Sequence, residues 1–272
     1  MLALSITWNP SPEIFEIGGF AVRWYGLLFA LSFFFGYLIM QRFFLKEEVP
    51  LKLLDELTTY MILGTIVGAR LGHVFFYEPE WYLAHPWKIL KVWEGGLASH
   101  GAGIGIILAI VIFSYVRKRP FFWIMDRIVI VAALSGFLIR TGNLMNSEIY
   151  GEPTSLPWGF LFLRSSVPGD ALVARHPTQI YEGLSYLAIF FYLWWLYYRK
   201  DGKPPPGLLF GLFLILVFGV RFLFEFIKEP QVGFEQGMAL NLGQLLSIPF
   251  VLMGCIFVYL AGKNRLSGTP QR

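Results

Sequence analysis

The segment GLFLILVFGVRFLFEF, residues 211–226, is the clearest indication of the fold class of this 272-residue chain. It contains no charged residue before Arg221, and Glu225 follows one helical turn later. A helix needs about 20 predominantly apolar residues to cross a bilayer, and the surrounding apolar segment 207–227 reaches that length. We therefore expect a membrane-spanning helix that keeps two charged residues near one end of its apolar run.

The rest of the chain has the same apolar character. Hydrophobic residues make up 56% of it and charged residues 15%, whereas a soluble globular domain carries about 25% charged residues. The apolar segments long enough to span a membrane are 22–41, 57–77, 97–116, 121–140, 179–198, 207–227 and 242–261. We therefore predict an all-α polytopic membrane protein with about seven transmembrane helices, forming a single integral membrane domain over residues 1–272.

The charges in the loops orient these helices. Twelve lysines and arginines follow the first, third, fifth and seventh segments, whereas six lie on the other side, in longer segments. Because cytoplasmic loops carry the excess of Lys and Arg, we expect an external N-terminus and a cytoplasmic C-terminus. The connection 141–178, which is rich in Gly, Pro and Asn, then faces outward, and we expect a small external cap there, between the fourth and fifth helices.

Arg70, Arg140 and Arg221 lie in the expected spans 57–77, 121–140 and 207–227. A charge in hydrocarbon costs at least about 2.5–3.5 kcal/mol, so a membrane protein that keeps one generally uses it. The guanidinium presents a fixed fork of donors that fits phosphate oxygens. The arginines therefore indicate a protein that handles a phosphate-bearing molecule, most simply a phospholipid. For Arg70 an internal structural role stays open, because it lies in GTIVGARLG, residues 64–72, whose glycine spacing lets helices approach closely.

The densest group of polar side chains is RTGNLMNSEIYG, residues 140–151, at the external end of the fourth span. Its guanidinium, carboxamides and carboxylate can together hold a phosphate and glycerol hydroxyls. The candidate binding residues are Arg140, Asn143, Asn146, Glu148 and Gly151. The alternative is an ordinary polar turn beside an arginine that snorkels to the interface.

Two other charged or titratable groups fall at the same expected depth. His100 lies in GGLASHG, residues 95–101, at the external entry to the third span, where a neutral imidazole can act as a base. The alternative is a hydrogen-bonded strut beside glycines that permit close helix packing. Arg221 and Glu225, spaced i and i+4, share one helix face and either neutralise each other or fix the arginine fork for a phosphate.

The stretch RHPTQIYE, residues 175–182, begins the fifth span. Its proline suits the start of a helix. Thr178 or Gln179 is expected to cap that helix. Glu182 would then enter the edge of the bilayer, where we expect it to support the binding site.

The sequence also argues against several classes of site. Neither an HExxH motif nor a clustered set of carboxylates occurs, so no metal or other cofactor is expected. A serine-hydrolase elbow of the GxSxG kind is missing. The single cysteine, Cys255, lies in an apolar run and forms no internal disulfide. No basic patch alternates with stacking aromatics, so no nucleic-acid partner is expected.

Taken together, these motifs resemble the bacterial prolipoprotein diacylglyceryl transferase family through most of the chain. The matching motifs are WYG (24–26), GARLGHVFFY (68–77), VWEGGLASHG (92–101), RTGNLMNSEIYG (140–151), RHPTQIYE (175–182), FGVRFLFEFIKEP (218–230) and GQLLSIP (243–249). Two positions depart from the family pattern. Ile139 precedes Arg140 where glycine is usual, and Ala102 follows the histidine motif where glycine is common. Neither departure removes a reacting group.

The resemblance implies a multi-pass enzyme of the bacterial cytoplasmic membrane, embedded among membrane lipids, with its active site toward the external face. It would move the diacylglyceryl group of phosphatidylglycerol to the lipobox cysteine that follows a prolipoprotein signal peptide. This is the first step of lipoprotein maturation. The thiolate of that cysteine attacks the glycerol carbon that bears the phosphate ester, a thioether forms and glycerol phosphate leaves.

The same resemblance assigns the reacting groups. Arg140 is similar to the signature arginine of the family and Arg221 to a second required arginine, and both would bind the phosphate. His100 is similar to the motif histidine and would favour the thiolate, with Tyr25, similar to a motif tyrosine, or Glu225 as rivals for the base. Asn143 and Asn146 would orient the headgroup, and Glu148, Gly151, Glu182 and Arg70 complete the expected binding residues.

Three other classes of protein compete with this interpretation. A lipid transporter or flippase also suits arginines in the membrane, but the sequence lacks the symmetric broken helices of transporters. A structural membrane scaffold leaves the polar groups unexplained. A phospholipase that uses water as its nucleophile is the nearest enzymatic alternative, since it would release glycerol phosphate without a protein substrate.

Overall fold

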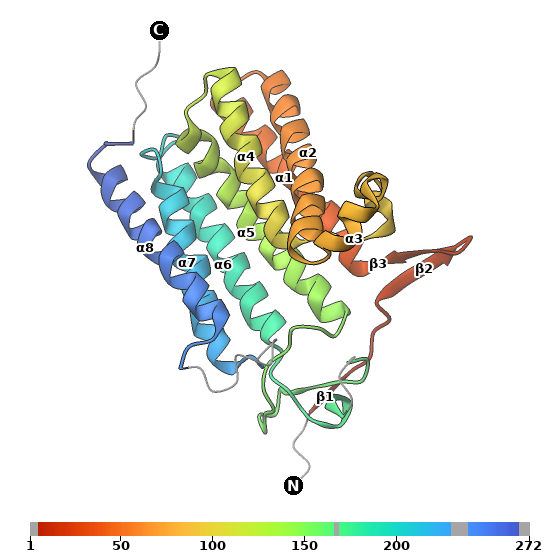
Figure 1. Cartoon of the computed structure of the whole chain (residues 1–272). Coiled ribbons are helices and arrows are strands. Elements are labelled where there is room, and N and C mark those ends of the chain that lie inside the picture. Colours follow the sequence, from red (N-terminus) through yellow and green to blue (C-terminus); the bar gives the residue numbers. More distant parts are fainter. Residues whose placement is uncertain (1–4, 166–168, 230–238, 267–272) are drawn as a thin grey trace. The chain divides into compact units, whose positions relative to one another are not determined.

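The computed structural model describes residues 5–165, 169–229 and 239–266, and the fold in these ranges is mainly helical (Figure 1). The α-helices are α1 (Trp24–Lys46), α2 (Leu51–Phe76), α3 (Pro79–Ala84), α4 (Ser99–Arg117), α5 (Phe121–Met145), α6 (Thr178–Arg199), α7 (Leu208–Phe224) and α8 (Leu242–Gly262). Short 3-10 helices are η1 (Pro86–Leu90), η2 (Val92–Glu94), η3 (Asp170–Leu172) and η4 (Glu225–Ile227). The strands are β1 (Ile6–Trp8), β2 (Glu13–Ile17), β3 (Phe20–Arg23) and β4 (Phe160–Phe162).

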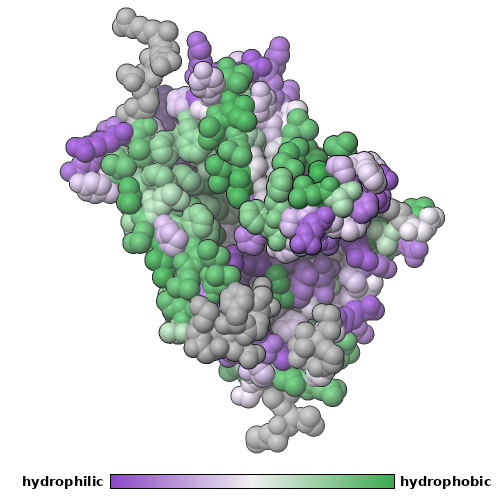
Figure 2. All heavy atoms as spheres, in the orientation of Figure 1, coloured by the Kyte–Doolittle hydropathy of each residue, from purple (hydrophilic) through white to green (hydrophobic). Residues whose placement is uncertain are grey.

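The long helices coincide with the predicted spans. Six helical segments of the described chain are long and apolar enough to cross a membrane: Trp24–Lys46, Leu51–Phe76, Ser99–Arg117, Phe121–Met145, Leu208–Ile227 and Leu242–Gly262. The remaining predicted span, 179–198, is helical as α6 but is not among these six. Figure 2 shows apolar side chains covering α7 and α8. The prediction of an all-α polytopic membrane protein is confirmed, although α1 and α5 run beyond their expected ends at 41 and 140.

The chain divides into two compact units. The first comprises Met1–Ile39 and Asp126–Leu266, and the second includes Met40–Met125. The first therefore holds the N-terminal strands, most of α5, and α6 to α8. The second holds α2 to α4. The expectation of a single domain stays a prediction.

In the first unit, the connection between α5 and α6 folds back onto the N-terminal strand β1. Strand β1 pairs in parallel with β4, with Thr7 opposite Leu161. Trp8 donates its indole N–H to the carbonyl of Leu144 at 2.8 Å. Tyr150 and Phe162 belong to a small apolar cluster against which Trp8 packs. This cluster fixes where the chain leaves α5, and that exit carries the polar motif 140–151. Whether the segment 141–178 is an external cap stays a prediction.

An acidic residue of α5 fixes the start of α7. Asp126 is fully buried, and its two oxygens accept hydrogen bonds from the backbone N–H groups of Gly207 at 2.8 Å and Phe210 at 2.9 Å. The first N–H groups of a helix lack partners within the helix, and a negative charge there is favourable. Gly207 has a φ of 83°, which glycine adopts without steric cost. The contact ties α7, which carries Arg221, to the helix that carries Arg140.

In the second unit, α2 and α4 pack with their backbones in close contact. A Cβ atom added at Gly72 would lie 2.7 Å from the Cα of Gly101, and one at Gly68 would lie 2.8 Å from the Cα of Gly105. Side chains larger than hydrogen would therefore force the helices apart. The prediction that these glycines permit close helix approach is confirmed. A Cβ atom added at Gly103 would meet no atom of the described residues within 4 Å, so this glycine takes no part in the contact.

Candidate functional site

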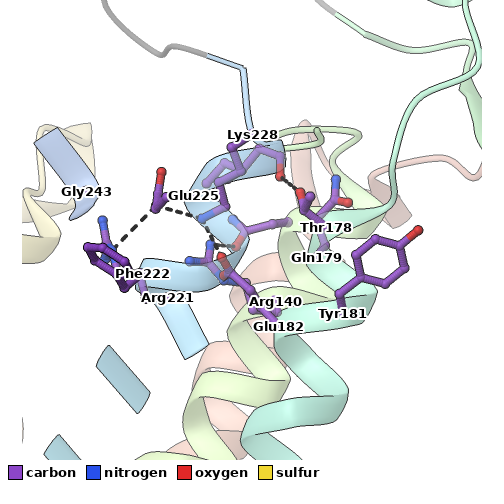
Figure 3. A network of polar contacts seen from close by, with 12 residues as sticks. Arg140, Thr178, Gln179, Tyr181, Glu182, Arg221, Phe222, Glu225, Lys228 and Gly243 are labelled. Atoms are coloured by element: carbon purple, nitrogen blue, oxygen red, sulfur yellow. Dashed lines mark hydrogen bonds and ion pairs between the residues drawn. The ribbon is translucent and has the colours of Figure 1, made fainter. Parts of the chain in front are cut away.

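A chain of ion pairs joins three helices of the first unit at the end of α7 (Figure 3). It runs from Arg140 of α5 to Glu182 of α6, then to Lys228, to Glu225 of η4, and back to Arg221 of α7. The Lys228 ammonium lies 2.9 Å from Glu225, and Arg221 lies 3.6 Å from the same carboxylate. Five charged groups from segments far apart in sequence therefore form one connected network.

Arg140 reaches this network and the polar turn that follows α5 at the same time. Its Nε pairs with Glu182, whose side chain is only 1% exposed. Its Nη1 donates to Asn143 Oδ1 at 3.1 Å. Asn143 in turn donates to the Glu148 carboxylate at 2.7 Å, and Asn146 donates to the same oxygen at 3.3 Å. The structure thus gathers three predicted binding residues of the motif 140–151, namely Asn143, Asn146 and Glu148, around Arg140.

The start of α6 holds the turn that contains Glu148. The Thr178 hydroxyl donates to the carbonyl of Ile149 at 2.9 Å, and Gln179 donates its amide to the carbonyl of Glu148 at 2.7 Å. The expectation that Thr178 or Gln179 caps α6 is wrong, because Pro177 is the N-cap residue and no side-chain cap bond forms. These side chains instead donate to backbone carbonyls of the turn after α5, which the tertiary fold places beside them.

Gly151 lies where three segments of the first unit meet. Its N–H donates to the carbonyl of His176 at 2.8 Å, and it pairs with Lys228 in an isolated antiparallel bridge. A Cβ atom there would lie 2.8 Å from Thr178 Cγ2 and would collide with the carbonyl of Ile227. Any larger residue at this position would therefore overlap the backbone just before Lys228 and the side chain of Thr178 at the start of α6.

The carboxylate of Glu225 is fixed by the start of α8. Asn241, which is the N-cap of α8, donates to Glu225 Oε2 at 3.1 Å and also to its backbone carbonyl. A Cβ atom at Gly243 would lie 2.7 Å from Glu225 Oε1, so only glycine leaves room for this carboxylate. Arg221 is held less tightly. Its side chain is 37% exposed, and its Nε makes no hydrogen bond to any described residue.

Tyr25 lies in the same unit, at the start of α1. A Cβ atom added at Gly142 would lie 2.8 Å from Tyr25 Cδ2, so the tyrosine ring packs directly on the backbone of α5, two residues past Arg140. The structure therefore brings Tyr25, Arg140, Asn143 and the Arg221–Glu225 pair into one unit.

His100 and Arg70 belong to the second unit. His100 is an exposed residue in the first turn of α4. Its predicted place beside the arginines of the first unit stays a prediction. Each unit carries one part of the predicted catalytic set.

Arg70 is buried in α2 and binds the backbone of the connection between α3 and α4. Its guanidinium donates to the carbonyls of Lys88, Ile89, Lys91, Gly95 and Gly96. Five carbonyl partners are the full donor capacity of an arginine. The geometry favours the internal structural role that the sequence left open for this residue.

The same connection carries exposed ion pairs. The Lys88 ammonium lies 2.7 Å from the Glu94 carboxylate, and this hydrogen bond lowers the pKa of Glu94. Among the described residues, no group of three or more His, Cys, Asp or Glu side chains is placed to hold a metal ion.

Comparison with known proteins decides the family. The chain matches the family described as prolipoprotein diacylglyceryl transferase over residues 12–260. It belongs to this family. Relatives named phosphatidylglycerol–prolipoprotein diacylglyceryl transferase include proteins of Tolumonas auensis, 50% identical over 95% of this chain and 98% of the relative, and of Chloroherpeton thalassium, 46% identical over 95% of each. A relative of the same name from Porphyromonas gingivalis is 46% identical over 96% of each chain.

In this member of the prolipoprotein diacylglyceryl transferase family, two buried cations at the site are not predicted from sequence. In sequence Lys228 is only one of the external basic residues, yet it lies between Glu182 and Glu225. Arg175 donates to the carbonyl of Gly151 at 3.3 Å and pairs with Glu229. Both residues lie within motifs that the chain shares with the family, so their positions in these motifs could have indicated a role at the site.

Proposed function

We propose that this chain transfers the diacylglyceryl group of phosphatidylglycerol to the thiol of a prolipoprotein lipobox cysteine. The observation that carries the proposal is the buried network that joins Arg140 and Arg221 from separate helices. Both guanidiniums keep donors that the described residues do not use, and arginine forks match phosphate oxygens. Membership of the family, with relatives that carry this name over nearly the full chain, supports the same reaction.

The reaction forms one bond and breaks one bond. The cysteine sulfur attacks the glycerol carbon that bears the phosphate ester, an S–C bond forms, and the C–O bond to phosphate breaks. The electron pair of that C–O bond stays with glycerol phosphate, so the phosphate gains negative charge as it leaves. The thiol proton passes to a base, because the thiolate is the effective nucleophile.

The predicted catalytic and binding residues then have separate tasks. Arg140 and Arg221 bind the phosphodiester and stabilise the charge that develops on the leaving phosphate. Asn143 fixes the Arg140 fork, and Glu182 holds it from the opposite side. His100 takes the thiol proton, with Tyr25 and Glu225 as the alternative bases.

The polar turn after α5 and the start of α6 offer acceptors for the glycerol of the headgroup. Asn146 Oδ1, Ser147 Oγ and Gln179 Oε1 are buried and have no hydrogen-bond partner among the described residues. Buried polar atoms are nearly always satisfied in folded proteins. The two hydroxyl groups of the phosphatidylglycerol headgroup would donate to Asn146 Oδ1 and Gln179 Oε1, and the Ser147 hydroxyl would donate to one of those hydroxyls in turn. This supports a glycerol-bearing phospholipid over one with a headgroup that lacks hydroxyls.

The site is expected toward the external face of the bacterial cytoplasmic membrane, with the N-terminus external and the C-terminus cytoplasmic. The loop charges support this orientation. Phosphatidylglycerol and the signal peptide of the prolipoprotein both reach such a site from within the bilayer. Confining both substrates to the membrane raises their effective concentration at the site.

The test is mass spectrometry of a lipobox peptide incubated with the purified protein and phosphatidylglycerol vesicles. The expected product is the peptide with a diacylglyceryl mass on its cysteine, with glycerol phosphate released in equal amount. A peptide whose cysteine is replaced by serine is the matched control. Glycerol phosphate released beside an unmodified peptide would identify a phospholipase instead. If folded protein binds the lipid but forms neither product, that result would favour a transporter.

A further inference from the structure

We propose that Lys228 sets the net positive charge of the ion-paired network and so acts as the positioning residue that makes it a site for a phosphate anion. This inference rests on the proposed function. Its starting point is the place of Lys228 in Figure 3, where its ammonium lies between the carboxylates of Glu182 and Glu225. Its side chain is 3% exposed.

The backbone places Lys228 at this point. The chain leaves η4 and pairs with the turn after α5, through the bridge between Gly151 and Lys228 and a hydrogen bond of 2.9 Å from Glu152 N–H to the carbonyl of Ile227. Gly151 permits the approach because it has no Cβ. The lysine side chain is thereby directed to α6, where it meets Glu182.

The charges of the directly paired groups do not cancel. Arg140, Arg221 and Lys228 are cations, whereas Glu182 and Glu225 are anions, so the network carries one net positive charge. Without Lys228, each arginine would be matched by one carboxylate, and the network would be neutral. Glu148 is the next carboxylate, and it reaches Arg140 only through the carboxamide of Asn143.

An excess charge among buried groups is costly unless a counter-charge relieves it. A phosphodiester carries one negative charge, which equals the excess of the network. As the C–O bond breaks, the phosphate acquires further negative charge. A cation placed there before reaction therefore stabilises the transition state more than the bound lipid. Because Lys228 occupies both carboxylates, it also leaves Arg140 and Arg221 donors free for phosphate oxygens.

A purely mechanical role for Lys228, as a strut between η4 and α6, makes a different prediction. A strut depends on the contacts of Lys228 with both carboxylates, so removing one of those carboxylates as well would cause further damage. A charge-setting residue depends on the sum of the charges. In that case, removing one negative charge should compensate for the loss of the lysine.

The experiment measures phosphatidylglycerol affinity, turnover and thermal unfolding for the full-length protein in nanodiscs of phosphatidylcholine with added phosphatidylglycerol. The variants are Lys228→Arg, Lys228→Met, Glu225→Gln and the double variant Lys228→Met with Glu225→Gln, which restores one net positive charge. Affinity is the deciding quantity, because binding requires no proton transfer and Glu225 is one of the alternative bases.

For Lys228→Met we expect the affinity for phosphatidylglycerol to fall about tenfold or more and kcat to fall about 100-fold, in the range for loss of one preorganised charge-stabilising group. Lys228→Arg should stay within about threefold of wild type in affinity. The double variant should recover at least half of the lost binding free energy, as a double-mutant cycle reports. A double variant that binds no better than Lys228→Met, or Lys228→Met with wild-type affinity, would overturn the proposal.

Failure of this inference and failure of the proposed function give different results. If the wild-type protein modifies the lipobox peptide and Lys228→Met binds and turns over normally, only the inference fails. If the wild-type protein makes no thioether but its affinity for phosphatidylglycerol follows the charge of the network, the inference stands and the transferase reaction does not. Should Lys228→Met not fold, Lys228→Arg and the double variant decide, since both keep the net charge.

Discussion

Replacing Arg140 by lysine tests whether the forked guanidinium is needed at the phosphate. The structure uses Arg140 Nε for Glu182 and one N–H of Nη1 for Asn143. An arginine has five N–H donors, so three are left for a phosphate. A lysine has three donors, and if it satisfied the same two partners it would keep one.

The substitution therefore removes at least one preorganised donor from the charge that develops on the leaving group. Loss of one such donor lowers kcat by about 10²–10³, or about 2.7–4 kcal/mol of transition-state stabilisation. We expect Arg140→Lys to show a fall of this size while its thermal unfolding stays near that of wild type, because the ion pair with Glu182 can be kept.

The assay is the initial rate of glycerol phosphate release from phosphatidylglycerol vesicles with a saturating lipobox peptide. The matched control is Arg117→Lys, because Arg117 pairs with Glu56 at an exposed position of the second unit. Exposed ion pairs contribute little to stability, so this variant should keep its rate. An Arg140→Lys rate within about threefold of wild type would show that the forked guanidinium is not needed and that a single point charge suffices.

Three further substitutions test separate contacts. Arg70→Lys should lower the free energy of unfolding by roughly 3 kcal/mol. Lysine can donate to at most three of the five carbonyls, and each lost charged hydrogen bond is worth about 1.5–3 kcal/mol. An unchanged chemical denaturation curve would show that these hydrogen bonds are dispensable. Gly151→Ala should destabilise the first unit by about 1–3 kcal/mol through overcrowding and should reduce turnover. Gly103→Ala is the control, because an added Cβ at that position meets no described atom within 4 Å. Equal melting temperatures for the two variants would contradict this prediction. Asp126→Ala should lower the free energy of unfolding by about 1–3 kcal/mol for each backbone N–H left without its acceptor at the start of α7. Proteolysis of the loop before α7 should then become faster. An unaltered cleavage rate would show that Asp126 does not stabilise the start of α7.

Much of the helical architecture was predictable, because a membrane-spanning helix can be recognised from the apolar residues of its own segment. A segment that must satisfy its own backbone hydrogen bonds in hydrocarbon forms a helix, so apolar runs such as 207–227 and 242–261 fix helix positions to within a few residues. The glycine contacts between α2 and α4 were predictable for a similar reason, since their spacing lies along one helix face.

The contacts of polar residues near the helix ends were less predictable. Thr178 and Gln179 look like helix caps in sequence, but they bond to the turn after α5, because the fold brings unpaired carbonyls within reach. Arg70 occupies an apolar span like Arg140, yet it meets backbone carbonyls where Arg140 meets a carboxylate. The sequence identifies the hydrogen-bond donors, whereas the tertiary fold determines which acceptors lie within their reach.

Hydropathy and motif spacing are enough to predict a helical membrane protein, to locate the charged residues in its apolar spans and to assign those residues to family motifs. Hydrophobicity, helical period and motif spacing are local properties, so they can be read along one segment. The position of Lys228 between Glu182 and Glu225 could not be predicted in this way, because it requires the chain after α7 to pair with the turn after α5. Interactions between charges depend on distance in space, and residues 140, 182 and 228 become neighbours only when the helices pack.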